Sequence, residues 1–133
     1  MSLAYLIDTD WIIDHFNQIE PITRKPEEMR PAGLAVSIVS LAELYEGVLH
    51  STNPTQSEAV LLRFLRSLSV LPIDEEICKT FGHERGKLRQ QGKTVGDFDL
   101  LIASTSLRHN LTLCTNNRRH FDMVDGLQIV SHP

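Results

Sequence analysis

Short apolar runs that alternate with segments of helical periodicity constrain the fold of this chain more than any other feature of its sequence. Each run is bounded by polar residues, as is typical of a buried strand. No tight hairpin signal joins consecutive runs, so the strands should be connected by crossovers and be mainly parallel. The predicted strands cover residues 3–7, 34–37, 70–73, 111–115 and 127–130.

Between these runs, apolar residues recur at helical spacing. The predicted helices cover residues 11–16, a segment that Ser40 opens and that runs to 48, a segment that Ser57 caps and that runs to 68, and residues 75–91 and 97–110. Helices on both faces of a mainly parallel five-stranded sheet make a three-layer α/β/α fold. The 133 residues, 41% of them apolar, suffice for one domain spanning residues 1–133.

The polar segment 18–33 is the exception to this alternation. It contains Pro21, Pro26 and Pro31, together with Arg24 and Lys25. Such a composition predicts a mobile loop that could cover a site.

Composition excludes several classes of protein. A net charge of −4 argues against a protein that coats nucleic acid through a uniformly basic face, although two local basic groups remain, at 83–93 and 118–120. These groups either contact phosphate or form solvated helix faces. No apolar run or charged leader indicates a membrane span or a signal peptide, so we expect a cytoplasmic protein. Cys78 and Cys114 lack the spacing of a zinc site, and both should be buried.

Polar residues cluster where the predicted strands end or the predicted helices begin. In an open parallel sheet, these points share one edge, where binding crevices form. Side chains from distant parts of the sequence should therefore converge there. The candidates are Asp8, Glu43, Asp97, Asp99, Asn116 and Asn117.

Each acid also has a structural explanation. Ser40 and Glu43 fit the reciprocal capping box, Asp97 is a good N-cap, and Asp99 suits the positive end of a helix dipole. Asp8 is harder to explain in this way, because a carboxylate that closes a buried strand needs hydrogen bonds or a cation.

Convergent carboxylates repel one another unless a cation holds them. Oxygen ligands without paired Cys or His select a hard ion, so we expect Mg²⁺, with Mn²⁺ as a substitute. Asp8 and Asp99 would hold the metal, and Glu43 would position or deprotonate water, directly or through a second ion. Asp97 would complete the set or cap its helix. Such a site favours phosphate chemistry.

Four segments together resemble the PIN-domain ribonucleases of the VapC toxin type. They are Leu6 to Asp10, Ser37 to Gly47 with Glu43, Gly96 to Ala103, and Thr115 to Asn117. The resemblance covers nearly the whole chain and implies an Mg²⁺-dependent endoribonuclease that a cognate antitoxin inhibits. It also implies a homodimer and makes transfer RNA a frequent target.

Carried over by position, the acids of that family fall on Asp8, Glu43 and Asp99. Many members have a further Asp after the Thr of the late strand, whereas this chain has Asn116 and Asn117. An amide can accept a hydrogen bond but supplies no charge. This departure concerns a second metal more than the first, and Asp122 is a possible substitute.

Substrate and partner surfaces follow less directly. Arg118 and Arg119 lie next to the expected site and can contact phosphate. The eight aromatic residues show no stacking pattern, and most occupy core-like positions. Leu44, Tyr45 and Val48 suggest an apolar groove near the helices between 40 and 68 that accepts an antitoxin segment, unless these side chains are simply core.

Two other classes of protein remain as alternatives. Asp8-Thr9-Asp10 after a strand resembles the nucleophile and acid of haloacid-dehalogenase phosphatases, but this reading leaves Glu43 and the Thr-Asn-Asn segment unexplained. The second alternative is a catalytically silent module that keeps the fold and binds RNA or an antitoxin.

Overall fold

A five-stranded parallel sheet forms the centre of the molecule. The computed structural model describes residues 3–17 and 25–131. The strand order is β3-β2-β1-β4-β5, and every neighbouring pair is parallel. The strands are β1 (Tyr5–Ile7), β2 (Leu34–Ser37), β3 (Ser69–Leu71), β4 (Thr112–Cys114) and β5 (Ile129–Val130). The prediction of a mainly parallel sheet is confirmed.

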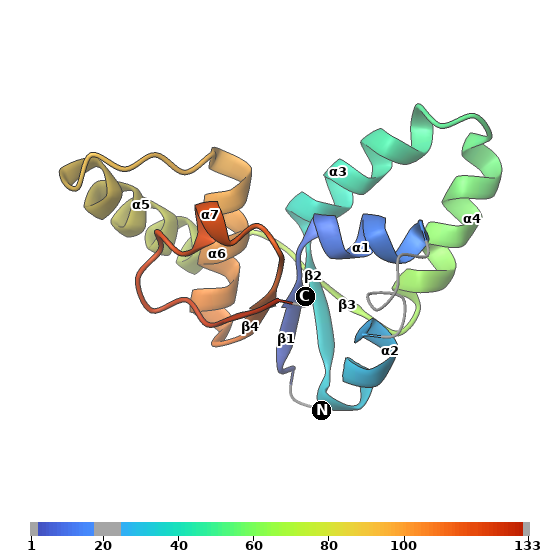
Figure 1. Cartoon of the computed structure of the whole chain (residues 1–133), viewed down its shortest axis with the longest axis horizontal. Helices are drawn as coiled ribbons and strands as arrows, with labels where there is room; N and C mark the ends of the chain where they lie inside the picture. The colour runs from blue at the N-terminus through green and yellow to red at the C-terminus, as the bar shows by residue number, and fades with distance from the viewer. Residues whose placement is uncertain (1–2, 18–24, 132–133) are drawn as a thin grey trace.

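Helices cover both faces of the sheet. They are α1 (Thr9–Phe16), α2 (Lys25–Met29), α3 (Ile38–Leu49), α4 (Pro54–Leu65), α5 (Glu75–Gln90), α6 (Asp97–His109) and α7 (Arg118–Phe121), with a 3₁₀ turn, η1 (Arg30–Ala32). Figure 1 shows α1, α3 and α4 on one side of the strands and α5, α6 and α7 on the other. The predicted three-layer architecture is therefore confirmed.

The core is divided between these two faces because side chains alternate along each strand. On β1, Leu6 packs in the cluster beneath α5 and α6, whereas Ile7 packs in the cluster beneath α1, α3 and α4. Both side chains are completely buried. The central strand thus joins two apolar layers, and its carboxyl end is held rigidly between them.

Two helices begin earlier in the sequence than predicted. Ser37, the last residue of β2, caps α3 by accepting a hydrogen bond from the Val39 N–H at 3.0 Å. Asn53, not Ser57, caps α4, and Pro54 occupies its first position. Pro is favoured there because the first helical N–H groups have no partner within the helix.

The segment 18–33 is only partly a loop. Its residues 18–24 lie outside the described residues, and so does the expectation of mobility for them. The remainder forms α2 and η1, and Gly33, at φ 95°, leads into β2.

Cys114 is buried as expected, but the prediction for Cys78 is wrong, because it faces solvent on α5. Within residues 3–17 and 25–131, no helix is both long enough and apolar enough to cross a membrane.

Candidate functional site

Asp8 lies at the carboxyl end of β1 and caps α1. Its Oδ1 accepts a hydrogen bond from the Thr9 N–H, and its Oδ2 accepts one from the Thr115 hydroxyl, both at 2.8 Å. Thr115 is near because β4 pairs with β1, with Cys114 opposite Ile7. Burial, and then the charge of Asp10, raises the pKa of Asp8 to about 7, against the two hydrogen bonds that lower it. Asp99 also raises this pKa. A buried carboxyl group therefore meets further negative charge at this edge of the sheet.

Asp10 is a site residue to which the sequence analysis gave a chemical role only in the phosphatase alternative. Its Oδ2 accepts a hydrogen bond from the Asn116 N–H at 3.2 Å and lies 3.4 Å from the Thr115 hydroxyl. Its Oδ1 is buried and has no hydrogen-bond partner within residues 3–17 and 25–131. Burial raises the pKa of Asp10 as well. The available signal was its position two residues after Asp8, in the first turn of a helix that follows a strand.

Glu43 reaches the site from α3. The Thr9 hydroxyl donates to Glu43 Oε1 at 2.7 Å and lies 2.9 Å from Ser40 Oγ. The predicted capping box of Ser40 and Glu43 is wrong, because Ser37 caps the helix and Ser40 is already its third residue. Glu43 therefore does not cap α3. Its side chain instead accepts a hydrogen bond from Thr9, the residue next to Asp8.

Asp99 lies in the first turn of α6 and contacts α7. Its Oδ2 is 3.1 Å from His120 Nδ1, which is also 3.2 Å from Asn117 Nδ2. The sequence analysis counted His120 only among basic residues, because a four-residue helix such as α7 has no periodicity that would position a side chain. Asp99 and His120 place α6 and α7 at the same edge as Asp8.

Asp97 makes different contacts from those of Asp99. It begins α6 as expected, but Gly96 is the N-cap, so the predicted capping role is wrong. Its Oδ1 accepts a hydrogen bond from Arg85 of α5 at 2.6 Å, and Arg85 also donates to the Val95 carbonyl at 2.7 Å. These bonds connect the start of α6 to α5. The catalytic role of Asp97 stays a prediction.

Polar groups after β4 complete the surroundings of the site. The Trp11 indole donates to Asn116 Oδ1 at 3.1 Å, and the Asn117 N–H donates to the Thr115 hydroxyl at 3.0 Å. Asp122, the possible substitute for a carboxylate at 116, instead pairs with Arg118 at 3.3 Å. Asp10 is the carboxylate that lies against Asn116.

A hard divalent cation suits the chemistry of these donors. In the described residues no three His, Cys, Asp or Glu side chains are already grouped to hold a metal ion. The donors around Asp8 are nevertheless oxygens, burial and then acidic neighbours raise the pKa of Asp8, and no described residue donates a hydrogen bond to the buried Asp10 Oδ1. A cation would offset that charge and satisfy that oxygen.

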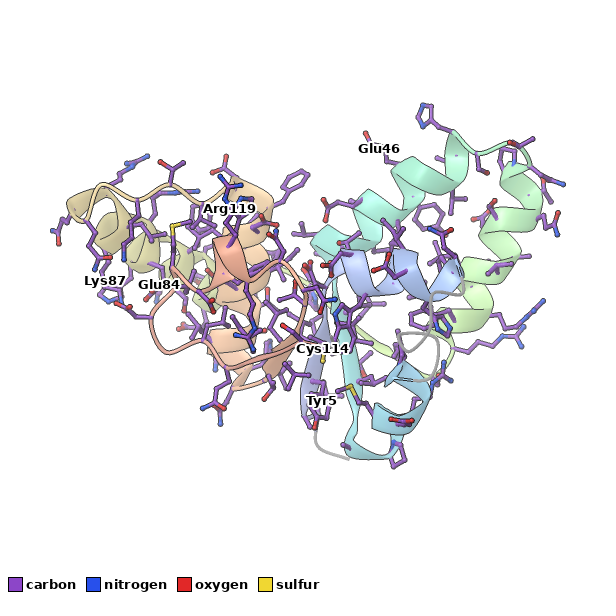
Figure 2. All side chains as sticks on the ribbon, viewed as in Figure 1. Tyr5, Glu46, Glu84, Lys87, Cys114 and Arg119 are labelled. Atoms are coloured by element: carbon purple, nitrogen blue, oxygen red, sulfur yellow. The ribbon has the colours of Figure 1, made fainter. Side chains whose placement is uncertain are left out.

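A groove extends from the acidic site between α1, α3 and α4. One part, of about 460 Å³, is bordered by Ile13, Glu43 and Val60, and an adjoining part, of about 560 Å³, by Thr9, Glu46 and His50. Leu44 and Val48 border it but are buried, and Tyr45 turns to Glu58, to which its hydroxyl donates at 3.1 Å. Figure 2 shows Glu46 projecting from α3. The predicted groove exists, but its exposed apolar rim comes from Ile13 and Val60.

Carboxylates gathered at the carboxyl edge of a parallel α/β/α sheet define the class of this protein. The PIN domain family model matches residues 5–127, and the chain belongs to this family.

Within that family the chain resembles the VapC ribonucleases. It is 31% identical over 126 residues to the tRNA(fMet)-specific endonuclease VapC of Shigella flexneri, covering 95% of this chain and 96% of that protein. It is 33% identical over 132 residues to the ribonuclease VapC2 of Haemophilus influenzae, with 95% and 96% covered. The VapBC2 complex of Rickettsia felis, solved bound to a DNA fragment from its promoter, matches with a TM-score of 0.90 at 28% identity, covering 98% of this chain and 100% of that one. The resemblance expected from the sequence motifs is confirmed.

Proposed function

We propose that this protein is an endoribonuclease and the toxin of a type II toxin–antitoxin pair, and that it hydrolyses RNA phosphodiesters with the help of Mg²⁺. The observation that carries the proposal is the buried Asp8 at the carboxyl end of β1, where Asp10 and Asp99 add negative charge near it. Carboxylates gathered around a buried carboxyl group repel it, and a bound divalent cation would offset that repulsion. The VapC ribonucleases of similar sequence support the same conclusion.

Asp8, Asp99 and Glu43 would hold the cation, with Mn²⁺ as a substitute for Mg²⁺. When bound, the ion would lower the pKa of a water molecule and offset the charge of the phosphate. The chain's own hydrogen bonds orient the carboxylates: Thr115 holds Asp8 and Thr9 holds Glu43. Asp10 adds negative charge where the chain has Asn116, and Asp97 would support the site by fixing the start of α6.

The substrate would lie against the residues that follow β4. Asn116 and Asn117 offer amide groups beside Asp10 and His120, and Arg118 and Arg119 offer positive charge. Because a VapC relative is named a tRNA(fMet)-specific endonuclease, transfer RNA is the first substrate class to test.

An antitoxin segment would occupy the groove between α1, α3 and α4. Solved structures similar to this chain are VapBC complexes, which supports such a partner. The groove joins an apolar rim to Glu43, so an amphipathic segment could place an arginine against the carboxylates. We further propose that the protein works in the cytoplasm and forms a homodimer. Light scattering would test the homodimer.

The experiment compares cleavage of total cellular RNA by the wild type in Mg²⁺, Mn²⁺ or EDTA. Asp99→Asn keeps the shape of the side chain and removes its charge, and it should lower metal-dependent cleavage at least 100-fold. Asp125→Asn is the matched control, because this exposed acid lies 3.8 Å from Lys87 and outside the site. It should retain wild-type activity.

The competing proposal is the catalytically silent binding module, favoured by the amides at 116 and 117. If the folded wild type cleaves no RNA with either metal, this alternative replaces the nuclease. Equal cleavage by the wild type and Asp99→Asn would show that the activity does not come from this site.

A further inference from the structure

Phe98 is an aromatic residue that the fold leaves in solvent. Its side chain is 56% exposed, whereas Phe64 and Phe121 are buried. No ring or cation–π contact joins Phe98 to another described residue, although such contacts involve Phe16, Phe64 and Phe81. A single exposed apolar side chain is common on protein surfaces, so the position of Phe98 decides what its ring can do.

The position of Phe98 on α6 brings it next to the candidate site. Successive residues of a helix are about 100° apart around its axis. Asp97 is directed to Arg85 of α5 and Asp99 to His120 of α7. Phe98 stands between these two directions, at the solvent-facing side of the first turn. Phe98 is therefore an exposed neighbour of the site residue Asp99 in the first turn of α6.

Arg119 provides an exposed cation on the neighbouring helix, α7. Asp99, which follows Phe98 in the chain, lies 3.1 Å from His120, which follows Arg119. Arg118 is occupied by Asp122 and by the Ile129 carbonyl, but no described residue forms a hydrogen bond or ion pair with the exposed Arg119 side chain. Figure 2 shows Arg119 projecting from α7 near the first turn of α6.

We propose that Phe98 and Arg119 form a nucleotide-binding rim, on which an unpaired base of the RNA stacks against Phe98 while Arg119 contacts a neighbouring phosphate. The proposal rests on the ribonuclease function proposed above and narrows its substrate class. A flat ring suits a nucleobase, and a free guanidinium on the neighbouring helix suits the phosphate. A base paired in a duplex presents only its edge, so the rim selects single-stranded or looped RNA.

Charge favours a nucleotide over an apolar protein surface as the occupant. Two carboxylates flank Phe98, and an apolar partner that covered the ring would also bury part of their charge at a cost. A stacked base leaves these carboxylates solvated or bound to a cation. Arg119 offsets their repulsion of the phosphate.

The binding experiment uses a fluorescein-labelled, single-stranded RNA of about ten nucleotides. Ca²⁺ replaces Mg²⁺, because both ions bind oxygen ligands. Gels show whether the RNA is cleaved during the measurement. Phe98→Ala should weaken binding by about 5-fold to 100-fold, the range measured for lost base stacking. Phe98→Tyr should restore it, and Phe98→Leu should not. Leu62→Ala is the control, because Leu62 is an exposed apolar residue on α4.

Two further measurements separate stacking from other contacts. A 2-aminopurine base in the same RNA should be quenched by the wild type and not by Phe98→Ala. Arg119→Ala should reduce the dependence of log Kd on log salt by about 0.7, the value for one phosphate of a single strand. Arg63→Ala should leave it unchanged, because Arg63 is exposed on α4, on the other side of the sheet.

Three results would overturn the proposal. They are wild-type affinity in Phe98→Ala, equal binding by the Leu and Tyr variants, and no binding by the wild type at about 100 µM, where even non-specific contacts are detected. It would also fall if Phe98→Ala altered the molar mass in light scattering but not RNA affinity. Cleavage tests the ribonuclease separately. If RNA binding depends on Phe98 but the wild type cleaves no RNA, the ribonuclease function is refuted and the nucleotide-binding rim is retained.

Discussion

Replacing Asp8 by asparagine should remove most of the pH dependence of stability in the metal-free protein. Asp8 is 5% exposed, and burial beside Asp10 raises its pKa from 3.8 to about 7. In the unfolded chain the same group loses its proton near pH 3.8. Between these values the folded state holds the extra proton, so the free energy of unfolding falls as the pH rises.

The size of this effect follows from the two pKa values. At about 1.36 kcal/mol for each pH unit, a rise from 3.8 to about 7 corresponds to about 4 kcal/mol, lost between roughly pH 4 and pH 7. Asparagine carries no charge at either pH, and the Thr115 hydroxyl can accept from its amide. Asp10, whose pKa is raised by burial, contributes in the same direction, so Asp8→Asn should leave a smaller slope.

Urea unfolding in EDTA, at several values between pH 5 and pH 7.5, measures the effect. The single tryptophan, Trp11, is completely buried and reports unfolding by fluorescence. Asp125→Asn serves as a control that should retain the wild-type slope. At pH 7.5, Mg²⁺ should raise the stability of the wild type more than that of Asp8→Asn, because only the wild type offers the carboxylate.

A wild-type stability that stays constant or increases from pH 5 to pH 7.5 would refute this reasoning. Equal slopes in the wild type and Asp8→Asn would assign the titration to other groups. Either result would remove the electrostatic basis for placing a cation beside Asp8.

Three further substitutions test individual contacts. Thr9→Val removes the donor to Glu43 and should lower cleavage by roughly 10-fold to 100-fold, as measured by initial rates. Asp97→Asn should lower the free energy of unfolding by less than about 1 kcal/mol, because its ion pair with Arg85 is exposed at one end, and rates should fall less than in Asp99→Asn. Ser37→Ala removes the cap of α3 and should cost about 1 kcal/mol in urea unfolding, with a value near zero contradicting the capping role.

The arrangement of the main acids could be predicted from the sequence because parallel strands deliver their carboxyl ends to one edge. Asp8 follows β1, and Asp99 lies in the first turn of a helix. Neither position depends on the details of side-chain packing. The strand-to-helix pattern was therefore enough to expect that residues about 90 positions apart would lie near one another.

Asp10 and His120 could not be predicted as site residues, because their roles depend on contacts distant in the chain. Asp10 is held by the N–H of Asn116, and His120 by Asp99 across two helices. Similarly, Ser37 and Ser40 are both acceptable caps by sequence. Ser37 caps α3 because β2 passes directly into the helix, with no intervening loop.

Because β1 is the central strand, the sheet cannot be completed until both of its neighbouring strands have been synthesised. β1 pairs on one side with β2 and on the other with β4, where Thr112 lies opposite Tyr5 although the two residues are distant in the sequence. Such pairing across the sequence gives a high contact order and delays folding until late residues are available. Asp8 therefore lacks its Thr115 partner on a nascent chain that has not yet passed residue 115, and the acidic site stays incomplete until β4 and the residues after it have been made.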